Sequence, residues 1–98
     1  VHCSFSVELA STADPQFKVI SIVSSSFFWP YPHMDQGDFV LKGRLSTSKS
    51  KNEYTVGKTS EVYSTDNFCR LNVTPAGVRI QFFERKGDAL GPPVDRSF

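Results

Sequence analysis

The chain has 98 residues, 39% hydrophobic and 13% aromatic, which is enough for one domain with a thin core. Its 11 basic and 10 acidic residues give a formal charge of +1, so it lacks the strongly basic balance that nucleic-acid binding favours. No segment approaches 18 consecutive apolar residues, and we therefore expect no membrane span.

Alternation of apolar and polar residues predicts strands from the start of the chain. The first alternating run has its apolar positions at Cys3, Phe5, Val7 and Leu9. A period of two is typical of a half-buried strand, so the intervening polar residues, Glu8 among them, are expected to face solvent. Residues 17–28 are rich in β-branched and aromatic side chains and predict a second strand.

Four more segments have strand character, and their ranges are 38–45, 53–63, 68–73 and 78–84. No stretch of ten or more residues combines a 3.6-residue period with capping residues, so no helix is expected. The sequence thus predicts an all-β fold, a six-stranded antiparallel β-sandwich or small barrel, over residues 1–85. Residues 86–98 are rich in Gly, Pro and charge and are expected to form a partly ordered C-terminal tail.

Two cysteines, Cys3 on the first strand and Cys69 on the fifth, are both expected to face inward. A cysteine pair in a small chain favours one disulfide and hence a secreted protein, and the alternative is two buried free thiols in a cytosolic protein. Because the chain starts at Val1 without methionine, we expect a processed or trimmed form whose targeting segment is gone.

The densest aromatic group lies in a proline-rich loop and contains Trp29, Tyr31 and His33. Tryptophan and tyrosine dominate binding hot spots, so the loop is a candidate partner-binding surface, although Trp29 could equally cap one end of the sandwich. Phe83 occupies an outward position on the sixth strand, where either the tail covers it or a partner contacts it.

The sequence contains no motif that is typical of a catalytic site. The two histidines, His2 and His33, have no motif around them that would pair a nucleophile with a base. Potential metal ligands do not cluster, and no glycine-rich phosphate loop is present. We therefore expect no catalytic residues, no bound metal and no cofactor, with an enzyme as the least favoured class.

Two other binding classes stay open. An immunoglobulin-like module is disfavoured because Trp29 lies 26 residues after Cys3 and because Phe68, rather than the usual corner tyrosine arrangement, precedes Cys69. A carbohydrate-binding module would use Trp29 and Tyr31 as sugar platforms. Asn72-Val73-Thr74 matches a glycosylation sequon, although Pro75 follows it directly.

The segments 66–73 (DNFCRLNV) and 78–83 (VRIQFF) resemble the C-terminal half of the MAX effectors, the secreted avirulence and toxin-like proteins of the blast fungus and its relatives. In that family a cysteine on the first strand pairs with one just after a short Asp/Asn turn on strand five. Those positions here are Cys3 and Cys69. The resemblance implies two three-stranded sheets, with strands one, two and six opposite strands three, four and five.

The same resemblance implies a secreted protein that acts in virulence or avirulence by binding host plant proteins, with translocation into host cells left open. Small heavy-metal-associated domains are among the implied partners, captured by pairing with an edge strand. The candidate edges are residues 17–23 and 38–44. We expect a monomer that binds neither nucleic acid nor membrane.

Overall fold

The structure is a computed structural model that describes residues 3–25, 28, 30, 42–46 and 53–98. Its strands, in chain order, are β1 (Phe5–Ser11), β2 (Lys18–Val23), β3 (Gly43–Ser46), β4 (Glu53–Gly57), β5 (Asn67–Thr74), β6 (Gly77–Glu84) and β7 (Ala89–Ser97). The described residues include no helix, and therefore none with the length and apolarity needed to cross a bilayer. The predicted all-β class is confirmed.

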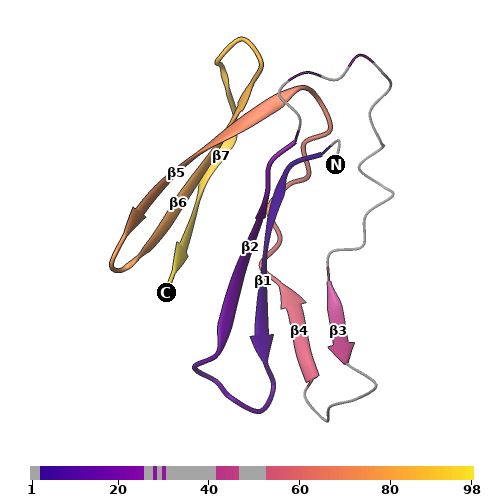
Figure 1. The fold of residues 1–98 in the computed structure, drawn as a ribbon, viewed down its shortest axis with the longest axis vertical. Coiled ribbons are helices and arrows are strands. Elements are labelled where there is room, and N and C mark those ends of the chain that lie inside the picture. The colour runs from indigo at the N-terminus through magenta and orange to yellow at the C-terminus, as the bar shows by residue number, and fades with distance from the viewer. Residues whose placement is uncertain (1–2, 26–27, 29, 31–41, 47–52) are drawn as a thin grey trace.

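The strands form two antiparallel sheets, one of four strands in the order β2-β1-β4-β3 and one of three strands in the order β5-β6-β7 (Figure 1). The β1–β2 hairpin turns at Asp14-Pro15, where the Phe17 amide donates to the Asp14 carbonyl at 3.1 Å. The β5–β6 hairpin turns within the two residues Pro75 and Ala76. Both hairpins follow local turn signals in the sequence.

The apolar core is centred on β6. Its inward side chains Val78, Ile80 and Phe82 are 7%, 0% and 1% exposed. Ile20 and Ile22 of β2 pack against them from the other sheet. Four further residues also pack against this cluster, namely Tyr63, Cys69, Leu90 and Val94. Full burial of each of the three β6 side chains contributes roughly 1.5–3 kcal/mol, so β6 is the strand that holds the sheets together.

The face of β1 that lies toward the other sheet is polar, although Cys3 and Val7 at the expected apolar positions are also buried, at 1% and 6% exposed. Ser6 lies opposite Ile22 and Glu8 opposite Ile20, and residues directly opposite in an antiparallel pair point to the same face of a sheet. Ser6 is fully buried and Glu8 is 8% exposed, so the prediction that Glu8 faces solvent is wrong. A buried carboxylate needs a partner, and Lys58 Nζ lies 3.4 Å from Glu8 Oε1.

Ser4 and Asn67 form the polar joint between the two sheets, and both are 0% exposed. The Ser4 hydroxyl donates to the Asn67 Oδ1 and accepts from the Ser25 amide at 2.6 Å. Asn67 Nδ2 donates in turn to the Thr65 carbonyl at 2.6 Å. Backbone hydrogen bonds between Ser4 and Tyr63, at 2.8 and 2.9 Å, close the joint.

The predicted disulfide is absent, because Cys3 and Cys69 are both free thiols in this structure. Cys69 packs against the β6 core cluster, and Cys3 lies one residue before the Ser4–Tyr63 bridge. The two chain segments therefore do meet, but through the hydrogen bond of Ser4 with Asn67.

The arrangement of strands also differs from the expectation. Residues 89–97, assigned from the sequence to a tail, form β7 and pair with β6 along its length. The pairing shifts register between Ile80 and Phe82, which accommodates the Gly-Pro-Pro segment 91–93, and Gly91 has a φ of 64° that favours glycine. Strands β1 and β6 lie in different sheets, whereas the resemblance implies that they share one sheet.

Several sequence-based ranges changed at their ends. The strand predicted over residues 53–63 stops at Gly57, and the one predicted over 17–28 is a strand from Lys18 to Val23. Of the strand predicted over 38–45, residues 38–41 lie outside the described residues, and β3 occupies Gly43–Ser46.

Replacing Asn67 by alanine is expected to lower the free energy of unfolding by about 2–4 kcal/mol, because the buried Ser4 hydroxyl and Thr65 carbonyl both lose a partner. Urea denaturation measures the change. Gln16→Ala, which removes an exposed amide from the β1–β2 turn, is the control and should change stability by less than about 0.5 kcal/mol. Equal losses in the two variants would contradict the role of Asn67.

Candidate protein-binding edge

Among the described strands, four lie at sheet edges, namely β2 and β3 in the larger sheet and β5 and β7 in the smaller one. The edge of β7 contains Pro92 and Pro93, which have no N–H to offer another strand. The edge strand β3 is only four residues long, from Gly43 to Ser46. In contrast, β5 has eight residues and no proline, so it offers the longest edge open to pairing in the described part of the chain.

The outer half of β5 is exposed on both faces, from Arg70 to Thr74. Leu71 and Val73 are 45% and 67% exposed, although they lie opposite Ile80 and Val78 of the buried core. On the apolar face of this sheet, the side chains of β6 are therefore buried and those of the outer half of β5 are exposed. In Figure 1 the end of this hairpin lies at the margin of the molecule, away from the four-stranded sheet.

The register of the hairpin fixes which backbone groups face the open edge. Thr74 and Gly77 close a two-residue turn and therefore form a hydrogen-bonded pair. Bonded and non-bonded pairs alternate along an antiparallel ladder, so Cys69, Leu71 and Val73 direct their N–H and C=O groups away from β6. No other described strand neighbours β5 on that side.

The outward face of the hairpin carries aromatic and cationic side chains. Phe68 and Phe83 stack with their ring centroids 5.3 Å apart and their planes 16° apart. The Arg70 guanidinium lies over the Phe83 ring at 5.3 Å. Phe83 is thus half-buried beneath side chains of β5, and Arg70 is held close to the open edge.

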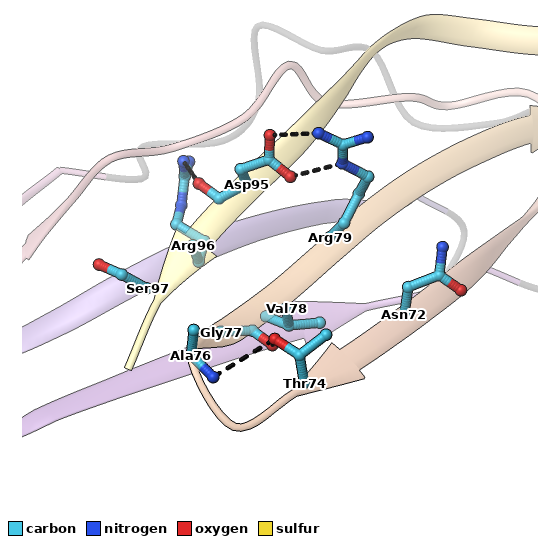
Figure 2. Close-up of a pocket in the computed structure, with 9 residues that line it drawn as sticks. All are labelled: Asn72, Thr74, Ala76, Gly77, Val78, Arg79, Asp95, Arg96 and Ser97. Atoms are coloured by element: carbon cyan, nitrogen blue, oxygen red, sulfur yellow. Dashed lines mark hydrogen bonds and ion pairs between the residues drawn. The ribbon is translucent and has the colours of Figure 1, made fainter.

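A shallow hollow of about 470 Å³ lies at the hairpin end (Figure 2). Its nine lining residues are Asn72, Thr74, Ala76, Gly77, Val78, Arg79, Asp95, Arg96 and Ser97. Gly77 is required there because a Cβ would collide with the carbonyl oxygen of Arg96 on β7. The Thr74 hydroxyl is already engaged with backbone atoms of Ala76 and Gly77.

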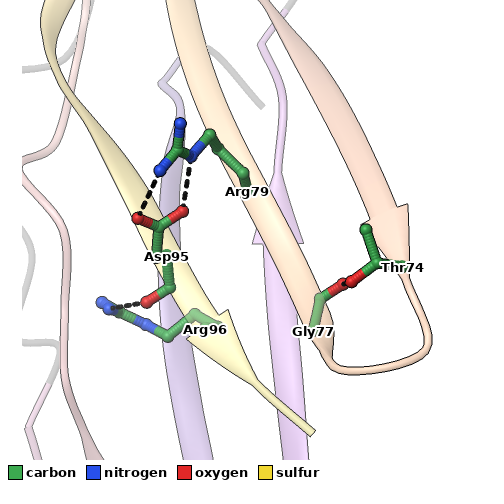
Figure 3. Close-up of polar contacts among 5 residues, drawn as sticks. All are labelled: Thr74, Gly77, Arg79, Asp95 and Arg96. Atoms are coloured by element: carbon green, nitrogen blue, oxygen red, sulfur yellow. Dashed lines mark hydrogen bonds and ion pairs between the residues drawn. The ribbon is translucent and has the colours of Figure 1, made fainter.

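A bidentate ion pair crosses this hollow from β6 to β7 (Figure 3). Arg79 Nε and Nη2 donate to the two carboxylate oxygens of Asp95 at 2.7 and 3.0 Å. These hydrogen bonds lower the pKa of Asp95 and raise the pKa of Arg79. Asp95 therefore stays ionised at neutral pH, which suits the locking of two strands rather than proton transfer.

Comparison with known proteins finds no matching family model, no matching curated protein and no matching solved structure.

The candidate residues from the sequence are only partly placed. Trp29, Tyr31 and His33 lie outside the described residues, whereas Phe83 lies on the outer face of the β5–β6 hairpin. The candidate edge at 17–23 is an edge strand, β2, but one face of it packs into the core.

Sequence reasoning missed the exposure of Leu71 and Val73. Their alternation with Arg70 and Asn72 assigns them correctly to the face that carries the core. It does not reveal where the opposing sheet ends, because that limit is set by strands distant in sequence.

The Asp95 carboxyl should titrate at a pH below its usual pKa of 3.8, because Arg79 stabilises the ionised form. The pair stabilises the fold above about pH 3.8, and this contribution is lost as the pH falls through the lowered pKa. NMR titration of the Asp95 carboxyl measures the value. Arg79→Gln should return it toward 3.8, and an unchanged pKa in that variant would contradict the assignment.

Both cysteines should alkylate after unfolding without reductant, since both are free thiols. In the native protein Cys69 should react before Cys3, because Cys3 is 1% exposed and burial raises the pKa of its thiol despite the nearby N-terminal charge. Intact mass spectrometry counts the adducts. An unfolded protein that takes up no adduct until it is reduced would instead establish the disulfide.

Proposed function

We propose that this protein is a non-catalytic binding domain that captures an extended segment of a partner protein by adding it to the edge of β5. The single observation that carries the proposal is the exposed outer half of β5, where Leu71 and Val73 are 45% and 67% exposed at an edge that pairs with no other described strand. Main-chain hydrogen bonds would supply affinity in this mode, and alternate side chains would supply specificity.

The side chains of β5 suggest the character of the captured segment. On the core face, Leu71 and Val73 favour apolar residues at alternate positions of the incoming strand. On the outer face, Arg70 is exposed and favours an acidic residue opposite it. The proposed ligand is therefore an extended segment that alternates apolar residues with polar or acidic ones.

The contrast with β7 supports the choice of edge. An open edge strand invites aggregation, and proteins usually protect such edges with proline, charge or bulges. Here β7 has Pro92, Pro93 and a register shift, whereas β5 has one cation and no proline. Selection for binding at β5 would account for leaving this edge open.

An effector role in a host plant is a further part of the proposal, and it rests on the resemblance of residues 66–73 and 78–83 to the MAX effectors. Small heavy-metal-associated domains are the first folded partners to test on that ground. Secretion is likewise proposed from the resemblance, without a disulfide in this structure to support it.

Leu71→Pro should weaken binding of a strand-forming peptide roughly tenfold or more, because it removes an edge-facing N–H and places a ring at the edge. Peptides selected by display on the wild-type protein, and a purified heavy-metal-associated domain, are the probes. Calorimetry gives the affinity. Hydrogen exchange should show protection at the amides of Leu71 and Val73 on binding.

Leu71→Thr is the matched control, since it shortens the same side chain but keeps the N–H. It should bind more tightly than Leu71→Pro, and thermal melts should show that both variants fold. Equal affinity of wild type and Leu71→Pro, or protection confined to other strands, would overturn the β5 site.

A further inference from the structure

The open edge of β5 is complementary to itself. Beyond the buried Asn67, its edge-facing backbone groups belong to Cys69, Leu71 and Val73, which are spaced evenly about Leu71. A two-fold axis through Leu71 therefore lets two antiparallel copies of β5 exchange main-chain hydrogen bonds over residues 69–73. The segment ends before Pro75, which could not extend the ladder.

The side chains fit this register on the core face. Leu71 would lie opposite Leu71 of the second copy, and Cys69 opposite Val73 of the second copy. All three residues share one face of the strand, and Leu71 and Val73 are the exposed apolar residues of β5. Pairing would join the two exposed strips into one apolar band and reduce their contact with water.

Charge and the position of Pro75 favour this register over the two registers whose axis lies one residue away. With the axis at Leu71, Arg70 lies opposite Asn72 of the second copy, and no like charges meet. With the axis at Arg70, two guanidinium groups would face each other in a closely spaced pair, which is destabilising. With the axis at Asn72, Cys69 would fall opposite Pro75, which shortens the ladder at both ends.

We propose that the β5 edge pairs with β5 of a second copy of this chain about a two-fold axis at Leu71, doubling the three-stranded sheet. This inference rests on the proposed function, because the second copy takes the same edge as the captured segment. From the sequence we expect a monomer, whereas this pairing would give a dimer that must dissociate before a partner strand can bind to β5.

Charge exchange at Leu71 tests both the dimer and its register. Leu71→Arg and Leu71→Glu should each be monomeric, since each would set two like charges face to face at the axis. An equimolar mixture should recover a species of twice the 11.0 kDa chain mass, because arginine then faces glutamate. Sedimentation from micromolar to millimolar protein, with reductant to keep Cys69 from bridging copies, measures the mass.

Val19→Arg is the control, because Val19 is 43% exposed on another edge strand, β2, and its substitution should leave the dimer intact. Circular dichroism and thermal melts confirm that each variant folds. A wild type that stays monomeric overturns the dimer, and a mixture that stays monomeric overturns the register.

The outcomes separate this inference from the proposed function. If the wild type is monomeric but binds a selected peptide that Leu71→Pro loses, capture at β5 stands and self-pairing falls. If the charge-exchanged mixture dimerises but no peptide or domain binds at β5, self-pairing stands and partner capture falls. If both hold, adding the peptide should dissociate the dimer.

Discussion

The buried hydrogen bond between Ser4 and Asn67 sets the relation between the two sheets. Ser4 lies just before β1, Asn67 begins β5, and each side chain is fully shielded from water. Buried polar groups are costly unless every partner is in place, so such a network tolerates few alternative arrangements. The apolar contacts of Ile80 and Phe82 with β2 supply burial, but burial alone is non-directional. The polar joint therefore fixes where β5 starts and which part of it the other sheet can cover.

From that starting point, the open edge follows from position across the sheet. Val73 and Leu71 of β5 lie directly opposite Val78 and Ile80 of β6, which are buried. Ile20 and Ile22 of β2 pack against the β6 cluster, one strand inward from the edge. The far half of β5 then lies beyond the cover of the larger sheet, and its apolar residues Leu71 and Val73 are left at the surface. Exposure at the edge is thus a result of how the sheets are joined.

Local patterns predicted the all-β class of the fold, because the alternation of apolar and polar residues acts over a few positions. For β1 they were right only in part, because Cys3 and Val7 are buried as expected, but Ser6 and Glu8 are buried too and point to the other sheet. Lys58 supplies a partner for Glu8 and Asn67 supplies one for Ser4, and those partners are more than 40 residues away. The buried Ser6 hydroxyl has no hydrogen-bond partner among the described residues. The tail prediction failed for a related reason. Pro92 and Pro93 suggest a break, but a register shift in the ladder absorbs them and lets Leu90 and Val94 reach the core.

The two edges of the smaller sheet show how one β-sheet can be closed on one side and open on the other. On β7, prolines withhold donors, while the Arg79–Asp95 pair and the close approach of Gly77 to Arg96 tie the strand to β6. On β5, the backbone groups of Leu71 and Val73 face no described strand, and Arg70 is held over Phe83 at the side of the edge. A row of like charges would repel any incoming strand of the same charge, but a single cation repels only a register that sets it against another cation. The edge thus selects among registers while staying open, which is the property that a site for strand pairing requires.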